Sequence, residues 1–344
     1  MKPMYSLQYN ALCLNLKQVP AVADCFIDKN VEDGFIVQVK FKDGHLFMLK
    51  VFLLARAYPS IISSLNITSS QEEHDYYVVM APYISAESAK ICEQQQFGYM
   101  DFSGNCRLLF HSLYLKIEGK PNAHSEKRAL QSIFDPRSSV SSAILREIMS
   151  DTTKRWRLKH LSEKLNCSIG QVSKVKNYLE EQLWAKMGPD GIEVTQSSAI
   201  MNAWSEAYSK KEVFAEKIEC YTLLPLSDFE EQLQQISRNS DIDIYLTGFS
   251  GGVRYTPVVR YNKVHLIITA DQLSSFLQLA PCTQVDSGAN VHIYVSTQKE
   301  ILFDARTIHG VQVASPVQVF LDCMKLFGRG EELAQAILTK EIEK

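Results

Sequence analysis

A segment near the middle of the chain combines side chains that can read DNA bases with side chains that can bind phosphate. Over 169–182, Val172, Val175 and Leu179 fall on one face of a helix, at spacings of three and four residues. Ser168 is a favourable N-cap, and the free N–H groups of the first turn can hold a phosphate. The face opposite the valines carries groups suited to base edges and phosphates in a major groove: Gly170, Gln171, Ser173, Lys174 and Asn177. We therefore predict a DNA-reading helix at 169–182.

The residues around this helix match a winged helix-turn-helix. The supporting elements are two helices at 139–149 and 158–165, the turn Asn166-Cys167, and two strands at 183–186 and 192–195 around Gly188-Pro189-Asp190-Gly191. The strands predict a hairpin, the wing, directly after the third helix. We add Arg157 and Lys186 to the predicted DNA-binding residues, with Lys186 on the wing beside the DNA backbone. A winged helix that makes only protein contacts is the alternative interpretation.

The charge distribution supports a local phosphate-binding module. Between 137 and 187 the chain has ten Lys and Arg against five Asp and Glu, whereas the whole chain has a net charge of -3. A basic island in an acidic chain is typical of a nucleic-acid-binding module. Charge alone is equally compatible with a solvated helical face.

The first third of the chain has a second set of candidate residues, which resembles the hairpin–helix–strand–helix core of PD-(D/E)XK nucleases. Such an enzyme needs two carboxylates to hold Mg²⁺ and a nearby lysine to assist the attacking water. Asp33 fits the first acid and Lys50 the lysine, but Met48 stands where the second acid is required, and a thioether does not ligate Mg²⁺. We predict a catalytically inactive relative without cofactor or metal. An acid that has moved to Asp43 or Glu72 keeps a Mg²⁺-dependent nuclease open as an alternative.

Other polar residues are better explained by structure than by chemistry. Asp101, Ser103 and Asn105 are interpreted as a turn between strands, with Gly104 and Asn105 suited to positive φ. The histidines are dispersed, and Ser250-Gly251-Gly252 lacks the Lys-Ser/Thr of a phosphate loop. Arg329 is predicted to pair with a neighbouring carboxylate and so fix the last two helices.

The remaining pattern predicts an α+β chain of three domains: a degenerate nuclease-like α/β domain at 1–120, the winged helix at 127–196 and a C-terminal α/β domain at 197–344. Residues 1–31 are predicted to be helical or irregular. Strands are predicted at 35–42, 46–52, 76–81, 99–101, 107–110, 113–118, 242–247, 264–269 and 291–296. Further helices are predicted at 58–65, 85–95, 199–208, 228–237, 316–327 and 331–343.

Cysteine usage and hydropathy indicate a cytoplasmic protein. The eight cysteines are scattered, without a CxxC pair or a Cys/His cluster, and are predicted to be thiols in a reducing compartment. The N-terminus lacks an apolar signal core, and no stretch reaches membrane-spanning length. The sequon Asn66-Ile67-Thr68 is therefore interpreted as chance.

Several stretches resemble the AbiEi-type transcriptional regulators, the antitoxins of type IV toxin–antitoxin (abortive infection) systems of bacteria. Three of them, Ala81–Ser85, Gly98–Asn105 and Ile117–Lys120, resemble the first domain of that family, and two, Ser315–Asp322 and Gly328–Glu332, resemble the end of its C-terminal domain. The resemblance spans about residues 33–340. It implies a repressor that binds inverted repeats in its own promoter and antagonises a nucleotidyltransferase-like toxin without necessarily touching it. A stand-alone relative with a different cellular role fits the resemblance equally well.

Together these observations predict a sequence-specific DNA-binding transcriptional regulator, an autorepressing antitoxin-like protein that binds double-stranded DNA as a homodimer. Two other classes remain open. One is the Mg²⁺-dependent nuclease guided by a winged helix, and the other is a protein-interaction scaffold.

Overall fold

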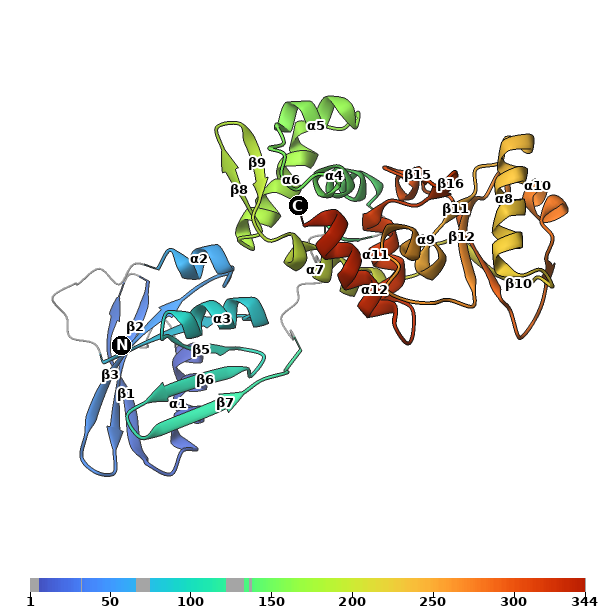
Figure 1. Cartoon of the computed structure of the whole chain (residues 1–344). Helices are drawn as coiled ribbons and strands as arrows, with labels where there is room; N and C mark the ends of the chain where they lie inside the picture. The colour runs from blue at the N-terminus through green and yellow to red at the C-terminus, as the bar shows by residue number, and fades with distance from the viewer. Residues whose placement is uncertain (1–5, 32, 66–74, 122–132, 136–137, 344) are drawn as a thin grey trace. The chain divides into compact units, whose positions relative to one another are not determined.

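The computed structural model describes residues 6–31, 33–65, 75–121, 133–135 and 138–343, and the chain divides into two compact units, Met1–Leu130 and Gln131–Lys344 (Figure 1). Both units combine helices with β-sheets, so the predicted α+β character is confirmed. Asn66-Ile67-Thr68, Glu72 and most of the predicted linker at 119–126 lie outside the described residues.

The first unit is a seven-stranded sheet whose strands neighbour one another in chain order. Its strands are β1 (Val22–Val31), β2 (Gly34–Phe41), β3 (Leu46–Leu53), β4 (Tyr76–Ala81), β5 (Gly98–Asp101), β6 (Cys106–Phe110) and β7 (Leu113–Ile117). The pairs β3–β4 and β4–β5 are parallel, and they are joined by crossovers that contain α2 (Pro59–Ser63) and α3 (Ala86–Gln94). Helix α1 (Ser6–Lys17) packs on one face, and α2 and α3 pack on the other.

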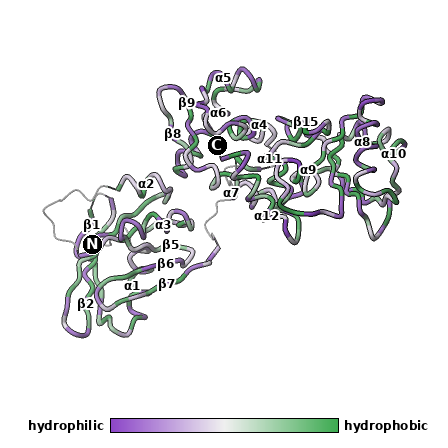
Figure 2. Tube along the Cα trace, viewed as in Figure 1, coloured by the Kyte–Doolittle hydropathy of each residue, from purple (hydrophilic) through white to green (hydrophobic). Residues whose placement is uncertain are grey.

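The hairpin β2–β3 follows the sequence pattern closely. Phe35, Val37, Val39 and Phe41 are buried, and β2 appears green in Figure 2 because of this apolar run. At the turn, Gly44 adopts a φ of +95° and the His45 N–H donates to the Asp43 carboxylate at 3.0 Å. The predicted Asp-Gly hairpin is therefore confirmed.

The N-terminal segment differs from its prediction. Residues 22–31 form β1, although 1–31 were expected to be helical or irregular. The pattern hides this strand because β1 lies at the sheet edge, exposes Asp24, Lys29 and Asn30, and pairs with β2 through two register shifts.

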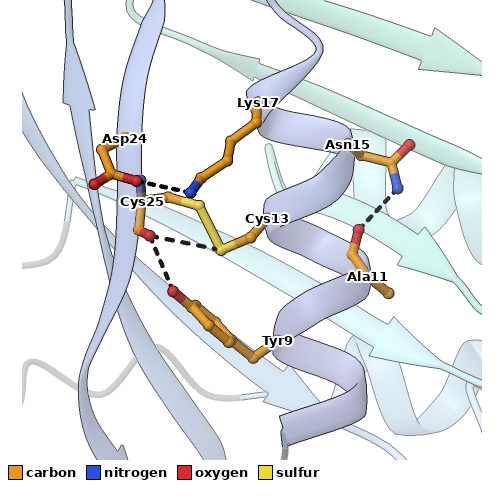
Figure 3. The surroundings of a disulfide bond; sticks show 7 residues. All are labelled: Tyr9, Ala11, Cys13, Asn15, Lys17, Asp24 and Cys25. Carbon is orange, nitrogen blue, oxygen red and sulfur yellow. Dashed lines mark hydrogen bonds and ion pairs between the residues drawn. A yellow bond between two sulfur atoms is a disulfide. The ribbon is translucent and has the colours of Figure 1, made fainter.

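The cysteine prediction also needs a correction, because Cys13 on α1 and Cys25 on β1 are joined by a disulfide (Figure 3). Beside it the Tyr9 hydroxyl donates to the Cys25 carbonyl at 2.9 Å, and Lys17 pairs with Asp24 at 2.9 Å. The other six cysteines are free thiols. The sequence gives no hint of the pairing, since the two residues meet only once the helix has packed on the unpredicted strand.

The second unit contains another seven-stranded sheet, in the order β13-β10-β14-β12-β11-β16-β15. Its strands are β10 (Glu216–Tyr221), β11 (Tyr245–Leu246), β12 (Val264–Thr269), β13 (Thr283–Gln284), β14 (Val291–Ser296), β15 (Arg306–Ile308) and β16 (Val311–Val313). Helices α8 (Leu226–Ser240) and α10 (Leu273–Leu279) cover one face. Helices α9 (Gly248–Tyr255), α11 (Pro316–Met324) and α12 (Gly330–Ile337) cover the other, with the short turns η1 (Lys299–Leu302) and η2 (Leu338–Ile342). The strand predicted at 242–247 is reduced to β11, because pairing begins only at Tyr245.

Before this sheet, the second unit forms three helices, a small hairpin and a further helix. They are α4 (Ser139–Ser150), α5 (Leu158–Lys164), α6 (Ile169–Glu181), β8 (Ala185–Gly188), β9 (Gly191–Val194) and α7 (Ser197–Ser209). Their buried side chains belong to one hydrophobic cluster that continues into α9, α11 and α12. The sequence therefore predicted these elements to within about two residues at most ends, but not that they share a core with the C-terminal helices.

A buried polar network sits inside this shared core. The Asp322 carboxylate on α11 accepts from the Tyr208 hydroxyl at 2.6 Å, from the Gln318 amide at 2.9 Å and from the Thr247 hydroxyl. Gln318 in turn accepts from the Arg146 guanidinium of α4 at 2.7 Å. Burial raises the pKa of both Asp322 and Tyr208 and lowers that of Arg146. The network thus ties α4 to α7 and α11 through hydrogen bonds that water does not reach.

Two further features of the described structure bear on the sequence predictions. Arg329 pairs with Glu332 and donates to the Val258 carbonyl at 3.0 Å, which confirms its predicted carboxylate partner. Among the described residues, no helix is both long enough and apolar enough to span a membrane.

Candidate nucleic-acid interface

Helix α6 is held in place by a wholly apolar face. Val172, Val175 and Leu179 have no exposed surface and pack in the same cluster as Ile144 of α4 and Leu161 of α5. Because these three residues return every three or four positions, most of the remaining circumference is left to polar side chains, with Ile169 and Tyr178 as the exceptions. The predicted buried face of α6 is confirmed.

The N-terminus of α6 is fixed by a capping box. The Ser168 hydroxyl accepts from the Gln171 backbone N–H at 3.2 Å, and the Gln171 side-chain oxygen accepts from the Ser168 N–H at 2.9 Å. These reciprocal bonds satisfy two donors that a helix start would otherwise leave unpaired. They also engage one end of the Gln171 amide, so only its NH₂ group remains to meet a base.

The side of α6 turned away from the valines is open. Gly170, Gln171, Lys174 and Asn177 are exposed, and Ser173 is half-buried. Lys174 and Asn177 form no side-chain hydrogen bond or ion pair with any other residue that the structure describes, whereas Lys176 pairs with Glu180 at 2.9 Å. We call the predicted residues of α6 and its N-cap the α6 face, although Gln171 and Ser173 lie on its two flanks: Ser168, Gly170, Gln171, Ser173, Lys174 and Asn177.

The hairpin β8–β9 is anchored to the segment before α5. Trp156, which is 2% exposed, exchanges two backbone hydrogen bonds of 2.9 Å with Ile192 of β9. Gly191 has a φ of +128°, and a Cβ there would meet the Trp156 carbonyl at 2.4 Å. Only glycine allows this approach without strain. The hairpin is consequently part of a small three-stranded arrangement.

Arg157 and Lys186, the predicted residues outside α6, lie on this arrangement and are exposed. Lys186 pairs with Glu193 at 2.9 Å, and its ammonium group lowers the pKa of that carboxyl. Arg157 reaches Asp190 at 3.6 Å. Arg155, which the sequence did not single out, contacts both Asp190 and Glu193. The sequence signal that could have drawn attention to Arg155 is the local excess of positive charge between 137 and 187.

The basic island is smaller at the surface than in the sequence. Arg146 is 3% exposed and belongs to the buried network, so it is not available to a phosphate. Lys164 is tied to the buried Glu147 at 2.6 Å. Arg137 lies outside the described residues. The cations left for an external anion lie on α6, on the hairpin, at Lys159 of α5 and in the segment 154–157 before α5.

The candidate nuclease residues are only partly brought together. Asp33, the candidate first acid, lies 3.7 Å from the ammonium group of Lys50, the candidate lysine. Met48 donates its backbone N–H to Asp75 at 2.7 Å, while Asp43 lies at the opposite end of the β2–β3 hairpin and binds His111 at 2.8 Å. The eight residues of β2 separate Asp43 from Asp33, which is roughly 26 Å at 3.3 Å per residue. Asp43 therefore does not complete that site.

The turn interpretation of the Asp101 stretch is confirmed. The Asp101 carboxylate accepts from the backbone N–H groups of Ser103 and Asn105, both at 2.9 Å, and from the Asn105 amide at 2.8 Å. Gly104 has a φ of +99°, but Asn105 does not adopt a positive φ and uses its side chain instead. Within the described residues, no group of three or more His, Cys, Asp or Glu side chains is arranged to hold a metal ion.

A family model matches the C-terminal part of the chain. Residues 193–343 match the family described as transcriptional regulator, AbiEi antitoxin, type IV toxin–antitoxin system. No curated protein and no solved structure gives a significant match to the chain. The matched region begins in β9 and contains α7, the seven-stranded sheet of the second unit and the helices that cover it, but not α4, α5 or α6. Of the buried polar network it includes Asp322, Gln318, Tyr208 and Thr247, and leaves out Arg146. The resemblance seen in the sequence to AbiEi-type antitoxins is confirmed over residues 193–343.

Proposed function

We propose that this chain is a transcriptional regulator that binds duplex DNA through a winged helix-turn-helix made of α4, α5, α6 and the β8–β9 hairpin. The observation that carries the proposal is the α6 face, where Lys174 and Asn177 are exposed opposite a fully buried face and Gln171 is exposed on its flank. A helix with amide and cationic side chains on its free side fits the major groove, where such groups read base edges. The hairpin supplies cations beside it for the adjacent phosphates.

The family suggests how such binding is used. We propose an antitoxin that represses its own promoter by binding an inverted repeat. Because an inverted repeat presents two symmetric half-sites, the binding species is a homodimer with two reading heads. Its functional partner is a toxin of the nucleotidyltransferase type.

We further propose that the first unit is a degenerate PD-(D/E)XK relative without catalytic activity. Met48 occupies the position of the second acid, and the displaced candidate Asp43 lies at the far end of the hairpin. Incubating the purified chain with supercoiled plasmid and Mg²⁺ or Mn²⁺ should leave the plasmid intact. Metal-dependent nicking would overturn this part of the proposal.

The deciding experiment is a gel shift with the region upstream of the gene that encodes this chain. The regulator should retain that duplex in the presence of excess scrambled DNA of equal length and composition. Equal retention of both duplexes, or of neither, would contradict sequence-specific binding and favour a protein-interaction scaffold.

Lys174→Ala should weaken binding to that duplex by about 1–3 kcal/mol. It should leave the fold unchanged, because the side chain is exposed and forms no hydrogen bond or ion pair with another described residue. If Lys174 contacts a phosphate, the log–log salt dependence should also become shallower by about 0.9. Lys210→Ala, at the exposed end of α7, is the matched control. Gln171→Ala should weaken binding as well, but it opens the capping box, so its thermal stability has to be measured alongside. Wild-type affinity in both α6 variants would contradict the assignment.

A further inference from the structure

The hairpin carries a row of alternating charges across three strands. The bridge between Trp156 and Ile192 is antiparallel, which places Arg155 opposite Glu193, and Glu193 is the register partner of Lys186 on β8. The Arg155 guanidinium lies 3.2 Å from one Glu193 oxygen, and the Lys186 ammonium lies 2.9 Å from the other. One carboxylate is therefore shared by two cations on the same face.

Asp190 at the tip of the hairpin repeats this arrangement. Its two oxygens lie 3.5 Å from Arg155 and 3.6 Å from Arg157. The three cations keep between 51% and 73% of their side-chain surface exposed, so they remain accessible to an external anion. We call Arg155, Arg157, Lys186, Asp190 and Glu193 the wing charge cluster. It contains three positive and two negative groups.

We infer that Asp190 and Glu193 act as built-in competitors for DNA phosphate and so limit how tightly the wing holds any duplex. The inference rests on the proposed DNA-binding function and deepens it. A phosphate that contacts Arg155 or Lys186 takes over the hydrogen-bonding position that a carboxylate now fills, since both anions suit the same donors. When DNA binds, the cations of the wing therefore exchange a carboxylate for a phosphate, and they do not start from an unpaired state.

This exchange changes the thermodynamics of binding. A free lysine or arginine that neutralises a phosphate releases condensed counterions into solution, which drives association and makes it depend steeply on salt. A cation already paired with Glu193 contributes less, because its own carboxylate is set free at the same time. Exposed ion pairs are weak and are screened by salt, so the exchange is feasible and is most costly at low ionic strength.

The test compares full-length wild type with Glu193→Gln and Asp190→Asn, which remove charge with little change in shape. Affinity is measured by fluorescence anisotropy for a scrambled duplex and for the upstream duplex, over a series of salt concentrations. Each variant should bind the scrambled duplex about three- to tenfold more tightly at low salt. The log–log salt slope should steepen by about one to two, corresponding to the one or two cations released.

The matched control is Glu332→Gln, which breaks the exposed ion pair with Arg329 in the same unit and changes the net charge equally. Its affinity should stay within twofold of wild type. Unchanged or weaker binding by both wing variants, with wild-type thermal stability, would overturn the inference and assign the acids to orienting the cations. Failure of wild type itself to bind either duplex would instead refute the proposed function.

Discussion

Replacing Asp322 by alanine is expected to lower the free energy of unfolding of the second unit by about 3–5 kcal/mol, the cost of breaking a buried charged network. Tyr208, Gln318 and Thr247 all donate to this carboxylate; the Tyr208 and Thr247 hydroxyls would be left without this acceptor, while the Gln318 amide would keep only the Tyr208 hydroxyl at 2.8 Å. Each buried polar group that loses its partner costs about 1–3 kcal/mol. The change also removes the negative group linked through Gln318 to the buried Arg146 guanidinium.

Urea denaturation followed by tryptophan fluorescence measures this effect selectively. All three tryptophans, Trp156, Trp184 and Trp204, lie in the second unit, so the signal reports that unit alone. Asp243→Ala at an exposed position is the control and should change stability by no more than about 0.5 kcal/mol. An Asp322→Ala midpoint equal to that of the control would mean that the network contributes nothing to stability.

Acidification is expected to destabilise the same unit through His265, by up to about 4 kcal/mol between pH 6.5 and pH 3. His265 on β12 is 3% exposed and stacks on His292 of β14 with ring centroids 5.1 Å apart. Burial, followed by the charge of His292, lowers the pKa of His265 to about 3. Below about pH 6.5 the unfolded chain binds a proton at this residue that the folded chain excludes. Stability is therefore full above that pH and is lost as the pH falls.

The contribution of His265 to the pH dependence of stability is isolated by comparing wild type with His265→Gln, because the glutamine amide does not titrate in this range. Between pH 7 and pH 4, wild type should lose about 3 kcal/mol more stability than the variant. His160→Gln, at an exposed position on α5, should follow the wild-type curve. Parallel curves for wild type and His265→Gln would show that His265 does not carry the pH dependence.

Elements with a strong internal pattern could be predicted from the sequence, and elements defined by distant partners could not. The alternation in β2 and the valine spacing of α6 gave both strand and helix correctly. Helix α9 was missed because Gly251 and Gly252 argue against a helix, whereas the structure needs them for close packing against Leu246 and Leu333. The short strand β11 depends on pairing with β12 and β16.

The candidate site shows the same division. Exposure of Lys174 and Asn177 follows from helical periodicity alone, so the α6 face could be predicted. The pairing of Arg155 with Glu193 could not, because it depends on a bridge between residues 36 positions apart in the chain. Gln318 and Asp322 belong to the stretch Ser315–Asp322, which resembles AbiEi-type regulators. Their role in the buried polar network likewise became clear only when α4 and α7 were placed against α11.

The continuous cluster that joins Leu161 and Val175 to Trp204, Phe320 and Leu333 has an evolutionary consequence. Helices α4 to α6 share their interior with the region that follows and cannot be transferred alone to another protein, because both halves would expose apolar surface and Arg146 would lose its partner. Under the proposed function, new operator preferences among relatives of this chain are therefore expected to arise by point substitutions on α6 rather than by recombination of whole segments.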